Sequence, residues 1–525
     1  MKKQLLFLPV LFFITFFSKA QSFEWLQTVD VEYEFNPEMI RYSTCADPQG
    51  GSYLFGIQEH VAFYNQSMGP LFLKRYNQQG EETWSRTMTG QSSAQGVFSS
   101  DNGDVYIIGE MYTDLDFWGE DTLVKIGIGT DGFLAKVNND GDLEWAINLS
   151  ELPMGEGSVA YLAFDEQDWL YAAYSTWQNS YVLIFNPDGE FQQSILQGNV
   201  ALISSLDFDD DGNLYAAGSC AGSSGTFGGV PFPAPFSYTT YLVKYNADLQ
   251  PVWVKFIEDI TCTFPQLKVD DTGWIYFAGQ LFKETLFDEI PVNGPSWTND
   301  FFLARLNPDG QFQWVAECPE VLTGDATIGS LHFLDIDPNG NALLTGIARG
   351  IVDWGNGVVS DVTENYQDII IWSYAPDGLV NWVKTAGGTG YELAQTISAD
   401  FDGGAYLAGV ISGTVVFDSI TRVSEDFTDP FLTRLDLDIL SATHEIEKTG
   451  EVMVYPNPAT DKIFIHSNSA YSEYRLFNST GHFVRSGNLS GGDKVISVEG
   501  LPAGLYLLTL KSKESLISYA RVMVL

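Results

Sequence analysis

The sequence predicts an all-β protein whose main body is a seven-bladed β-propeller and whose C-terminus is a small, immunoglobulin-like β-sandwich. Three observations predict this class: a repeat of strands and turns that returns seven times, a lack of helical periodicity, and a change of composition after Leu440. Aromatic residues make up 14% of the 525 residues, and the 50 glycines suit strands joined by many tight turns. The expected parts are a signal peptide at 1–20, the propeller at 21–440, a linker at 441–450 and the second domain at 451–525.

The N-terminus has the pattern of a secretory signal peptide. Two lysines precede an apolar run from Leu5 to Phe17, and the small residues that end at Ala20 allow cleavage before Gln21. The apolar run is too short for a comfortable membrane span, and no second long run follows it. We therefore expect an exported chain that has no transmembrane segment once the signal peptide is removed.

The first element of the repeat is a turn followed by a strand that carries an aromatic residue and, three residues later, a glycine. Tyr106 with Gly109 and Tyr276 with Gly279 show the pattern clearly, whereas the third copy has Tyr174 in place of the glycine. One such strand is expected at each of Tyr53, Tyr106, Tyr171, Tyr215, Tyr276, Leu343 and Tyr406.

The second element is an apolar strand, a turn resembling Asn-Pro-Asp-Gly, and a strand with tryptophan four residues after the glycine. The segment Phe301–Trp314 shows it best, and other copies end at Trp84, Trp145, Trp253 and Trp382. Two hairpins per repeat make four antiparallel strands, and seven such repeats describe a propeller better than a sandwich or a solenoid. The tryptophans hold one fixed place in the repeat, so we expect them to pack between neighbouring blades.

The seventh repeat ends near Asp438 without a tryptophan strand, and the missing strand has a match at the other end of the chain. Residues 23–29, Phe-Glu-Trp-Leu-Gln-Thr-Val, are similar to residues 82–88, Glu-Thr-Trp-Ser-Arg-Thr-Met. The N-terminal segment is therefore predicted to be the outer strand of the last blade. This pairing removes two free sheet edges and closes the ring.

The repeat elements together resemble a known family. The Tyr-x-x-Gly strand, the Asp-x-Phe-Leu strand and the Asp-Gly-x-x-x-Trp hairpin resemble the SBBP repeats of seven-bladed propellers, over residues 21–440. The resemblance implies the fold and says almost nothing about activity. Its departures concentrate in the third copy, where Gln193 stands at the tryptophan position, so that blade is expected to be short or irregular.

After the linker, Tyr455 lies near the start of a module whose alternating apolar runs predict a small β-sandwich. Its motifs Tyr-Pro-Asn-Pro-Ala, Leu-Phe-Asn-Ser-Thr-Gly and Leu-Pro-Ala-Gly-Leu-Tyr resemble the C-terminal (Por) sorting domains of the type IX secretion system of Bacteroidetes. The resemblance implies export through the periplasm, recognition by the type IX secretion machinery, and a product that is secreted or held at the outer cell surface. The sorting-motif residues are Pro456, Asn457, Pro458, Gly481, Gly504 and Tyr506.

Charge and residue usage exclude several classes of function. The chain has 68 acidic and 26 basic residues, a formal charge of −42 that repels phosphate backbones, so nucleic acid is not expected as a partner. Five histidines leave little material for a multi-histidine metal site or a Ser-His-Asp triad, and no catalytic residue is assigned. The four widely spaced cysteines allow three full disulfide pairings, between which the sequence does not choose.

The segment Asp207–Gly212 has the alternating carboxylates of a calcium loop, with Asp207, Asp209 and Asp211 as candidate ligands. An EF-hand would place a bidentate glutamate where Gly218 stands, and turn chemistry explains the same place in every repeat. No metal and no other cofactor is therefore assigned, while calcium at these three aspartates stays open as an alternative.

The long, dissimilar loops between the second and third strands of the blades are the expected binding face, because variable loops on a rigid scaffold usually carry function. Trp118, Trp297 and Trp354 in these loops are the expected ligand-binding residues. The expected function is a secreted or cell-surface binding or scaffold propeller whose ligand is a glycan or a surface protein. Two alternatives stay open: a carbohydrate-active hydrolase or lyase with paired carboxylates on the loop face, and a calcium-stabilised adhesin component.

Overall fold

The computed structural model divides into two compact units, residues 1–439 and residues 440–525, and each is described by itself. The signal peptide expected at 1–20 lies outside the described residues. The structure describes residues 21–31, 41–59, 61–63, 66–222, 224–234, 236, 238–258, 262, 264–270, 272–281, 283–294, 300–319, 324–362, 367–400, 402–424, 428–437, 453–466, 471–477, 483–489, 495–502, 504–512 and 517–524.

The described part of the first unit is built from antiparallel strands, with the short 3-10 turn η2 (Leu149–Glu151) and no α-helix. The strands form four-stranded groups in which, except in the last group, the chain order is also the order in space, a propeller-like arrangement. The long strand β6 is both the last strand of the first group and the first strand of the second. The groups are β2 (Ser43–Ala46), β3 (Ser52–Ile57), β5 (Gln66–Tyr76) and β6 (Glu82–Ser99); β6, β7 (Val105–Met111), β10 (Asp131–Val137) and β11 (Leu143–Asn148); β12 (Gly157–Phe164), β13 (Leu170–Thr176), β14 (Asn179–Phe185) and β15 (Phe191–Gly198); β16 (Val200–Phe208), β17 (Leu214–Ala221), β20 (Tyr238–Tyr245) and β21 (Pro251–Glu258); β22 (Gln266–Val269), β23 (Ile275–Leu281), β26 (Asp300–Leu306) and β27 (Phe312–Glu317); β28 (Asp325–Ile328) with β29 (Leu334–Ile336), β30 (Ala342–Gly355), β32 (Asp368–Tyr374) and β33 (Val380–Gly388); and β34 (Leu393–Ala399), β35 (Gly404–Ile411), β38 (Asp429–Asp436) and β1 (Ser22–Thr28).

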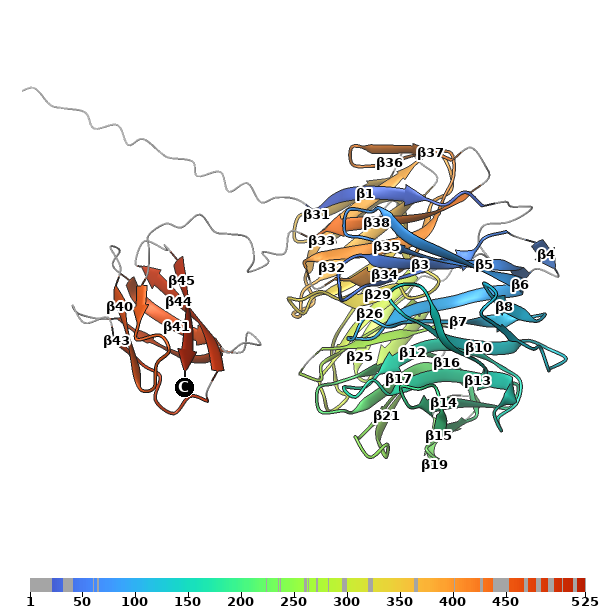
Figure 1. Ribbon diagram of the computed structural model, residues 1–525, viewed down its shortest axis with the longest axis horizontal. Helices are drawn as coiled ribbons and strands as arrows, with labels where there is room; N and C mark the ends of the chain where they lie inside the picture. Colours follow the sequence, from blue (N-terminus) through green and yellow to red (C-terminus); the bar gives the residue numbers. More distant parts are fainter. Residues whose placement is uncertain are drawn as a thin grey trace, which may run out of the picture. The chain divides into compact units, whose positions relative to one another are not determined.

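The N-terminal strand completes the last of these groups. Strand β1 pairs antiparallel with β38, with Leu26 opposite Thr433 and Thr28 opposite Phe431. In Figure 1 the blue β1 accordingly lies beside the orange β38. The pairing predicted for residues 23–29 is thereby confirmed, and it joins the two ends of the first unit.

Short hairpins fill most of the long connections between second and third strands. They fold back on the group before them: β8 pairs with β6, β18 with β15, and β36 with β33. These hairpins therefore cover neighbouring sheets and are not free loops. Their strands are β4 (Val61–Phe63), β8 (Leu115–Phe117), β9 (Asp121–Leu123), β18 (Ser224–Phe227), β19 (Val230–Pro233), β24 (Glu284–Phe287), β25 (Ile290–Asn293), β31 (Val358–Val362), β36 (Thr414–Phe417) and β37 (Ile420–Val423).

Five of the repeat tryptophans link their group to the next. The indole N–H of Trp253 donates to the carbonyl of Pro308, 3.3 Å away, in the turn between the last two strands of the following group. A Cβ atom on Gly310 in that turn would lie 2.8 Å from the Trp253 ring, so the ring lies directly against the glycine. The same contact recurs between Trp25 and Gly80, Trp84 and Gly141, Trp145 and Gly189, and Trp314 and Gly378.

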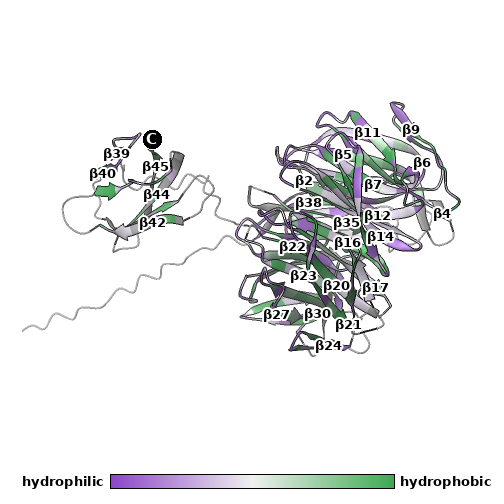
Figure 2. Cartoon of the chain, turned by 90° about the horizontal axis from the view of Figure 1, so that it is seen from below, coloured by the Kyte–Doolittle hydropathy of each residue, from purple (hydrophilic) through white to green (hydrophobic). Residues whose placement is uncertain are grey.

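Burial follows from this stacking of groups. All seven residues of β26 and all seven of β32 are buried, because both faces of these central strands are covered by neighbouring groups. Figure 2 shows the hydrophobic residues along the strands of the first unit and the hydrophilic residues mostly in its turns. The core is therefore spread between the sheets instead of being gathered in one layer.

The second unit contains two antiparallel sheets. One has the order β39 (Met453–Tyr455), β40 (Lys462–His466), β43 (Val495–Ser497), and the other has the order β42 (Phe483–Asn488), β41 (Tyr471–Phe477), β44 (Gly504–Ser512), β45 (Ile517–Val524). Ile463 and Ile496 from the first sheet share a buried cluster with Leu476, Leu508 and Val522 from the second. In the part of the chain that the structure describes, no helix has the length and apolar character needed to cross a membrane.

Candidate functional site

A cavity of 390 Å³ lies where the first strands of the groups meet, and its wall takes residues from β2, β6, β12, β16, β22, β29 and β34. Hydrogen bonds join many neighbouring first strands, such as Leu267 N–H to Ser205 Oγ at 3.1 Å. Another, from Thr44 N–H to Thr396 Oγ1 at 3.2 Å, joins the first group to the last. The first strands thus surround this central cavity.

Equivalent residues of the repeat line the cavity. Each first strand ends in a tight turn, closed for example by Gly212 N–H donating to the carbonyl of Asp209. The residue two places before each turn contributes to the cavity wall in every group. We call this set the cavity ring: Cys45, Phe98, Ala163, Asp207, Lys268, Asp335 and Ser398.

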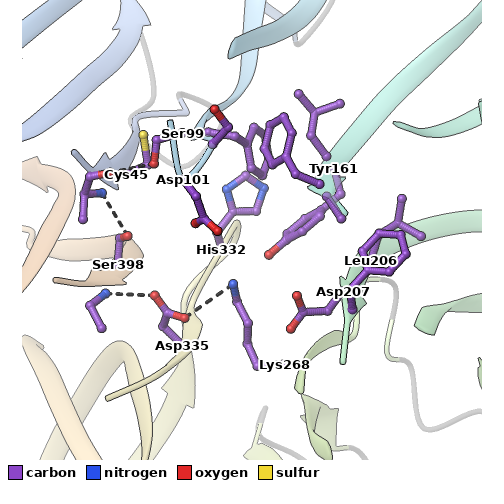
Figure 3. Close-up of a pocket in the computed structure, with 18 of the residues that line it drawn as sticks. Cys45, Ser99, Asp101, Tyr161, Leu206, Asp207, Lys268, His332, Asp335 and Ser398 are labelled. Carbon is purple, nitrogen blue, oxygen red and sulfur yellow. Dashed lines mark hydrogen bonds and ion pairs between the residues drawn. The ribbon is translucent and has the colours of Figure 1, made fainter. Parts of the chain in front are cut away.

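The polar half of the cavity ring is tied to the backbone of the next group. Asp207 Oδ2 accepts from Val269 N–H at 2.7 Å, and Asp335 Oδ2 accepts from Ala399 N–H at 2.8 Å. The other oxygen of Asp335 lies 3.4 Å from the ammonium of Lys268. Figure 3 shows Lys268 between the two carboxylates, each on a different strand. The repeat therefore places an ammonium between two carboxylates at one height of the cavity.

Aromatic side chains complete the wall beside this row of charges. The hydroxyl of Tyr161 points toward Lys268, and its ring lies 4.9 Å from the ring of His332 and 5.1 Å from that of Phe98. His332 also lies 4.9 Å from Phe98. The cavity thus offers ring faces next to hydrogen-bonding groups, as sites for small polar ligands do.

Burial and neighbouring charges set the protonation of these groups. Burial lowers the pKa of Lys268, but attraction to Asp335, Tyr161 and Asp207 outweighs it, so the net pKa lies well above the usual value and the amine stays charged. Burial raises the pKa of Asp207, partly offset by Lys268, and lowers the pKa of His332 to about 3. His332 is therefore a neutral imidazole at physiological pH and is not suited to act as a cation.

The cavity narrows at the end where the first strands begin. A second hollow there measures only 20 Å³, and His332 lines both spaces. The guanidinium of Arg41 donates to the side-chain oxygen of Gln95 and lies 5.9 Å from the ring centroid of Phe264, so these side chains lie together at this end. The larger cavity, by contrast, reaches the turns, where Asp101, Glu166 and Asp210 line it.

The structure places the tryptophans that were expected to bind ligand in different surroundings. Trp354 is 5% exposed and lies in the core, where its indole N–H donates to Ser360 Oγ at 3.0 Å and its ring lies 5.7 Å from Trp372. Trp118 is half-buried against Phe117, and Trp297 lies outside the described residues. Because the hairpins fold back on neighbouring groups, Trp354 and Trp118 do not form an exposed platform.

The calcium candidates have partners in different parts of the protein. Asp207 faces the central cavity, whereas Asp209 accepts from Tyr215 Oη at 2.8 Å and lies 3.5 Å from the ammonium of Lys244. Within the described ranges no cluster of three or more His, Cys, Asp or Glu side chains is placed to hold a metal ion. The Asp209 contacts are those of a capped turn.

Three of the six sorting-motif residues lie in the turn after β39. Pro456, Asn457 and Pro458 are exposed, and Asn457 Oδ1 accepts from Met523 N–H at 2.7 Å, which fixes the turn to the last strand. Tyr506 is buried on β44, the strand that begins at Gly504, whereas Gly481 lies outside the described residues. At the other end of the chain, Gln21 follows the expected cleavage site at Ala20, and its carbonyl accepts from Lys384 Nζ at 3.0 Å.

The sequence did not lead us to Tyr161, Lys268, His332 and Asp335 as site residues. The repeat itself carried a signal for the charged ring residues Asp207, Lys268 and Asp335. At the position two places before the turn, the first three copies carry cysteine, phenylalanine and alanine, and the later copies carry aspartate, lysine, aspartate and serine. Reading this position down the repeat would have found the charged row, because the propeller places equivalent residues at one height.

Comparison with solved structures gives distant similarities. The chain is similar to a catalytically inactive virginiamycin B lyase from Staphylococcus aureus with quinupristin (9% identity, TM-score 0.38, covering 78% of this chain and 99% of that one). It is also similar to a protein of unknown function from Bacteroides caccae (11%, TM-score 0.31, 70% and 94%) and to a protein from Lactobacillus plantarum (10%, TM-score 0.37, 68% and 89%). These low values carry no argument about activity. Among curated proteins no match is found.

The C-terminal unit has a match at the level of family. Residues 453–524 match the secretion system C-terminal sorting domain, which covers every described strand of the second unit. The match agrees with the motifs around Asn457 and Gly504. The chain therefore carries a C-terminal sorting domain of the type that supports export by type IX secretion.

Proposed function

We propose that the chain is an exported binding protein, a seven-bladed propeller of SBBP-type repeats, and that its ligand site is the central cavity. The observation that carries the proposal is the cavity ring, in which polar and charged residues gather in one half of an otherwise repetitive wall. A ring built only for packing would hold small or apolar residues in every group, as it does at Cys45, Phe98 and Ala163. Packing alone does not require a charged Lys268 between two aspartates, because burying charged groups costs free energy.

The ligand that best fits the chemistry of the cavity is a sugar unit of a glycan. Carboxylates such as Asp335 accept hydrogen bonds from sugar hydroxyls, and Lys268 and Tyr161 donate them. The rings of Phe98 and Tyr161 offer apolar faces for the C–H side of a sugar ring. A volume of 390 Å³ lies in the range of small-molecule sites, which favours the end of a glycan over the broad surface of a protein.

A hydrolase is the second candidate, because two carboxyl groups flank the same space. Burial raises the pKa of Asp207, which is what a general acid needs, while Asp335 lies across Lys268 from it. Each carboxylate, however, already accepts a backbone N–H of the next group, and Asp335 is also paired with Lys268. This arrangement favours fixed recognition over proton transfer.

Export places the binding site outside the cell. The sorting domain supports type IX secretion, and we propose that the propeller acts at the outer cell surface or in the medium, where glycans are abundant. The face with the turns, through which the cavity opens, would then point to the ligand.

The test is a glycan array followed by calorimetry with the strongest binder, comparing the exported chain with Tyr161→Phe. The variant removes one hydroxyl next to Lys268 and keeps the ring contacts, so we expect affinity to fall by roughly fivefold to tenfold. Tyr245→Phe is the matched control, because that hydroxyl is also buried but lies outside the cavity. Equal affinity of both variants would contradict the cavity site, and release of shorter sugars that Asp207→Asn abolishes would support the hydrolase instead.

A further inference from the structure

The wall of the central cavity is divided into an apolar arc and a polar arc. The first three groups of strands contribute apolar residues to the cavity ring, and the next three contribute charged residues. The apolar arc is Cys45, Phe98 and Ala163, and the polar arc is Asp207, Lys268 and Asp335. Because successive groups follow one another around the cavity, the two arcs lie on opposite sides of it. A ligand that fills the cavity therefore needs one apolar edge opposite one polar edge.

The polar arc keeps exposed surface inside the cavity. The side chains of Lys268 and Asp335 are 26% and 18% exposed, and both line the cavity wall. An ammonium group has three N–H donors, and each carboxylate oxygen accepts more than one hydrogen bond, so the contact between these two groups does not use all of them. The polar arc thus offers donors next to acceptors, which suits adjacent hydroxyl groups that both donate and accept.

The side chains of the apolar arc offer little to a hydroxyl group. Burial raises the pKa of the Cys45 thiol, so it stays neutral and is a weak donor. Beside it, the Ser99 hydroxyl already donates to the carbonyl of Ala46 at 2.7 Å. The N–H of Val97 likewise donates to Ser43 Oγ at 3.2 Å. A ligand hydroxyl placed against this arc would lose its hydration without a strong new partner, whereas a methyl group has no such cost.

We propose that the bound glycan ends in a 6-deoxyhexose, a sugar in which a methyl group replaces the hydroxymethyl group at C5. This inference rests on the proposed function, because it assigns the terminal sugar of that glycan. In the pyranose ring, C5 lies across from C2, so the methyl group and the hydroxyls at C2 and C3 are on opposite edges. The methyl group lies against the apolar arc, and the two hydroxyls meet Lys268 and Asp335.

N-acetylated sugars also carry a methyl group, but they fit the apolar arc less well. Their methyl group is attached to an amide, whose N–H and C=O both need hydrogen-bond partners when they leave water. Phe98 and Ala163 have no polar side-chain atom, and the Cys45 thiol bonds only weakly. The methyl group of a 6-deoxyhexose is attached directly to a ring carbon and makes no such demand.

The test titrates two pairs of methyl glycosides against the exported chain by ligand-observed NMR: L-rhamnose with L-mannose, and L-fucose with L-galactose. The members of each pair differ by one oxygen atom, at C6. We expect the 6-deoxy member of at least one pair to bind about tenfold more tightly. Its methyl protons should receive the strongest saturation transfer from the protein, because they lie against the wall.

Cys45→Ser tests the contact itself, because it keeps the shape of the side chain and gives the apolar arc a hydroxyl that can bond a C6 hydroxyl. The preference for the 6-deoxy sugar should fall to about twofold. Ala163→Ser makes the same kind of change at a second position of the arc and replaces Cys45→Ser if thermal unfolding shows that variant to be unfolded. Cys220→Ser is the matched control and should keep the preference, because that cysteine is also buried but does not line the cavity.

The outcomes separate this inference from the proposed function. Equal binding within both pairs, weakened by Tyr161→Phe, would leave the cavity as a glycan site and overturn the 6-deoxyhexose. A preference that Cys45→Ser and Ala163→Ser both keep, or weak saturation of the methyl protons, would contradict the placement against the apolar arc. If neither pair binds, a glycan from the array that Tyr161→Phe weakens would sink this inference alone, and an array without any binder would sink the proposed function with it.

Discussion

At the scale of single residues, several side chains around the cavity serve the fold and the cavity at once. Asp207, Asp335 and Ser398 each accept a backbone N–H from the next group, at 2.7, 2.8 and 3.0 Å. They line the cavity at the same time. Replacing one of them therefore changes stability and the cavity together, which is why Tyr161→Phe is the cleaner probe of binding.

Titration of a buried carboxyl group outside the cavity gives a prediction about pH. Glu392 is fully buried, and burial followed by the charge of Asp368 raises its pKa from 4.5 to about 8. Because the folded chain holds this proton more tightly than the unfolded chain, the stabilisation is present below about pH 4.5 and is lost as pH rises through 8. Glu392→Gln should remove about 2–4 kcal/mol of that pH-dependent loss.

The measurement is urea unfolding at intervals between pH 5 and 8. Glu289→Gln is the control, because Glu289 lies exposed in a hairpin turn. An unfolding free energy of the Glu392→Gln variant that falls as steeply with pH as that of the wild type would contradict the assignment.

At the scale of elements, the contact between a repeat tryptophan and a turn glycine is the device that joins neighbouring groups. Gly310 has φ of +77°, and an added Cβ would meet Trp253 at 2.8 Å. Gly340 has φ of +78° and nothing within 4 Å of an added Cβ. The two positions thus separate the cost of the backbone conformation from the cost of the ring contact.

Gly310→Ala should therefore destabilise the protein more than Gly340→Ala. The backbone conformation costs about 1–2 kcal/mol in both variants, and the clash with Trp253 adds about 1–3 kcal/mol in the first. Thermal unfolding of both variants measures the difference. Equal losses would show that the tryptophan moves aside freely and does not join the groups.

The regular elements could be predicted from the sequence because each copy of the repeat carries the same local signals. The strand at Tyr276, the hairpin that ends at Trp314 and the pairing of residues 23–29 all follow from turn residues and alternation. The hairpins between second and third strands could not be placed, because their pairing with the preceding group is a tertiary contact without a local signal. Trp354 was accordingly expected on the surface and lies in the core.

At the scale of the whole molecule, the two ends of the first unit depend on each other. Strand β1 supplies the outer strand of the last group, and Trp25 donates its indole N–H to the carbonyl of Gln78 in the first group, at 2.8 Å. The same short segment thus contacts the last group and the first.

Removal of residues 21–29 should destabilise the entire first unit. The loss exposes the edge of β38 and the buried side chains of Phe23 and Leu26, at a cost of about 3–6 kcal/mol. Urea unfolding of the shortened chain, followed by tryptophan fluorescence, checks this. A midpoint equal to that of the full chain would show that closure by β1 contributes little.

The position of the site depends on closure and therefore could be predicted only in part. The polar residues of the cavity ring are separated by about 60 residues along the chain, and only the meeting of the first strands brings Asp207, Lys268 and Asp335 together. The sequence pointed to the longer loops as the binding face, since their length and aromatic residues can be recognised without the structure. The short turns at the mouth of the cavity were expected to be structural, because the same turn recurs in every repeat.

Hydrogen–deuterium exchange with and without the glycan that binds most strongly on the array tests the central claim most directly, because it reports on both faces of the first unit in one measurement. If the central cavity is the site, the ligand should slow exchange in the turns at 100–104, 165–169 and 209–213 and leave the hairpins at 115–123 and 284–293 unchanged. Slowed exchange confined to those hairpins, with the turns unchanged, would contradict the account and place the binding site on the opposite face.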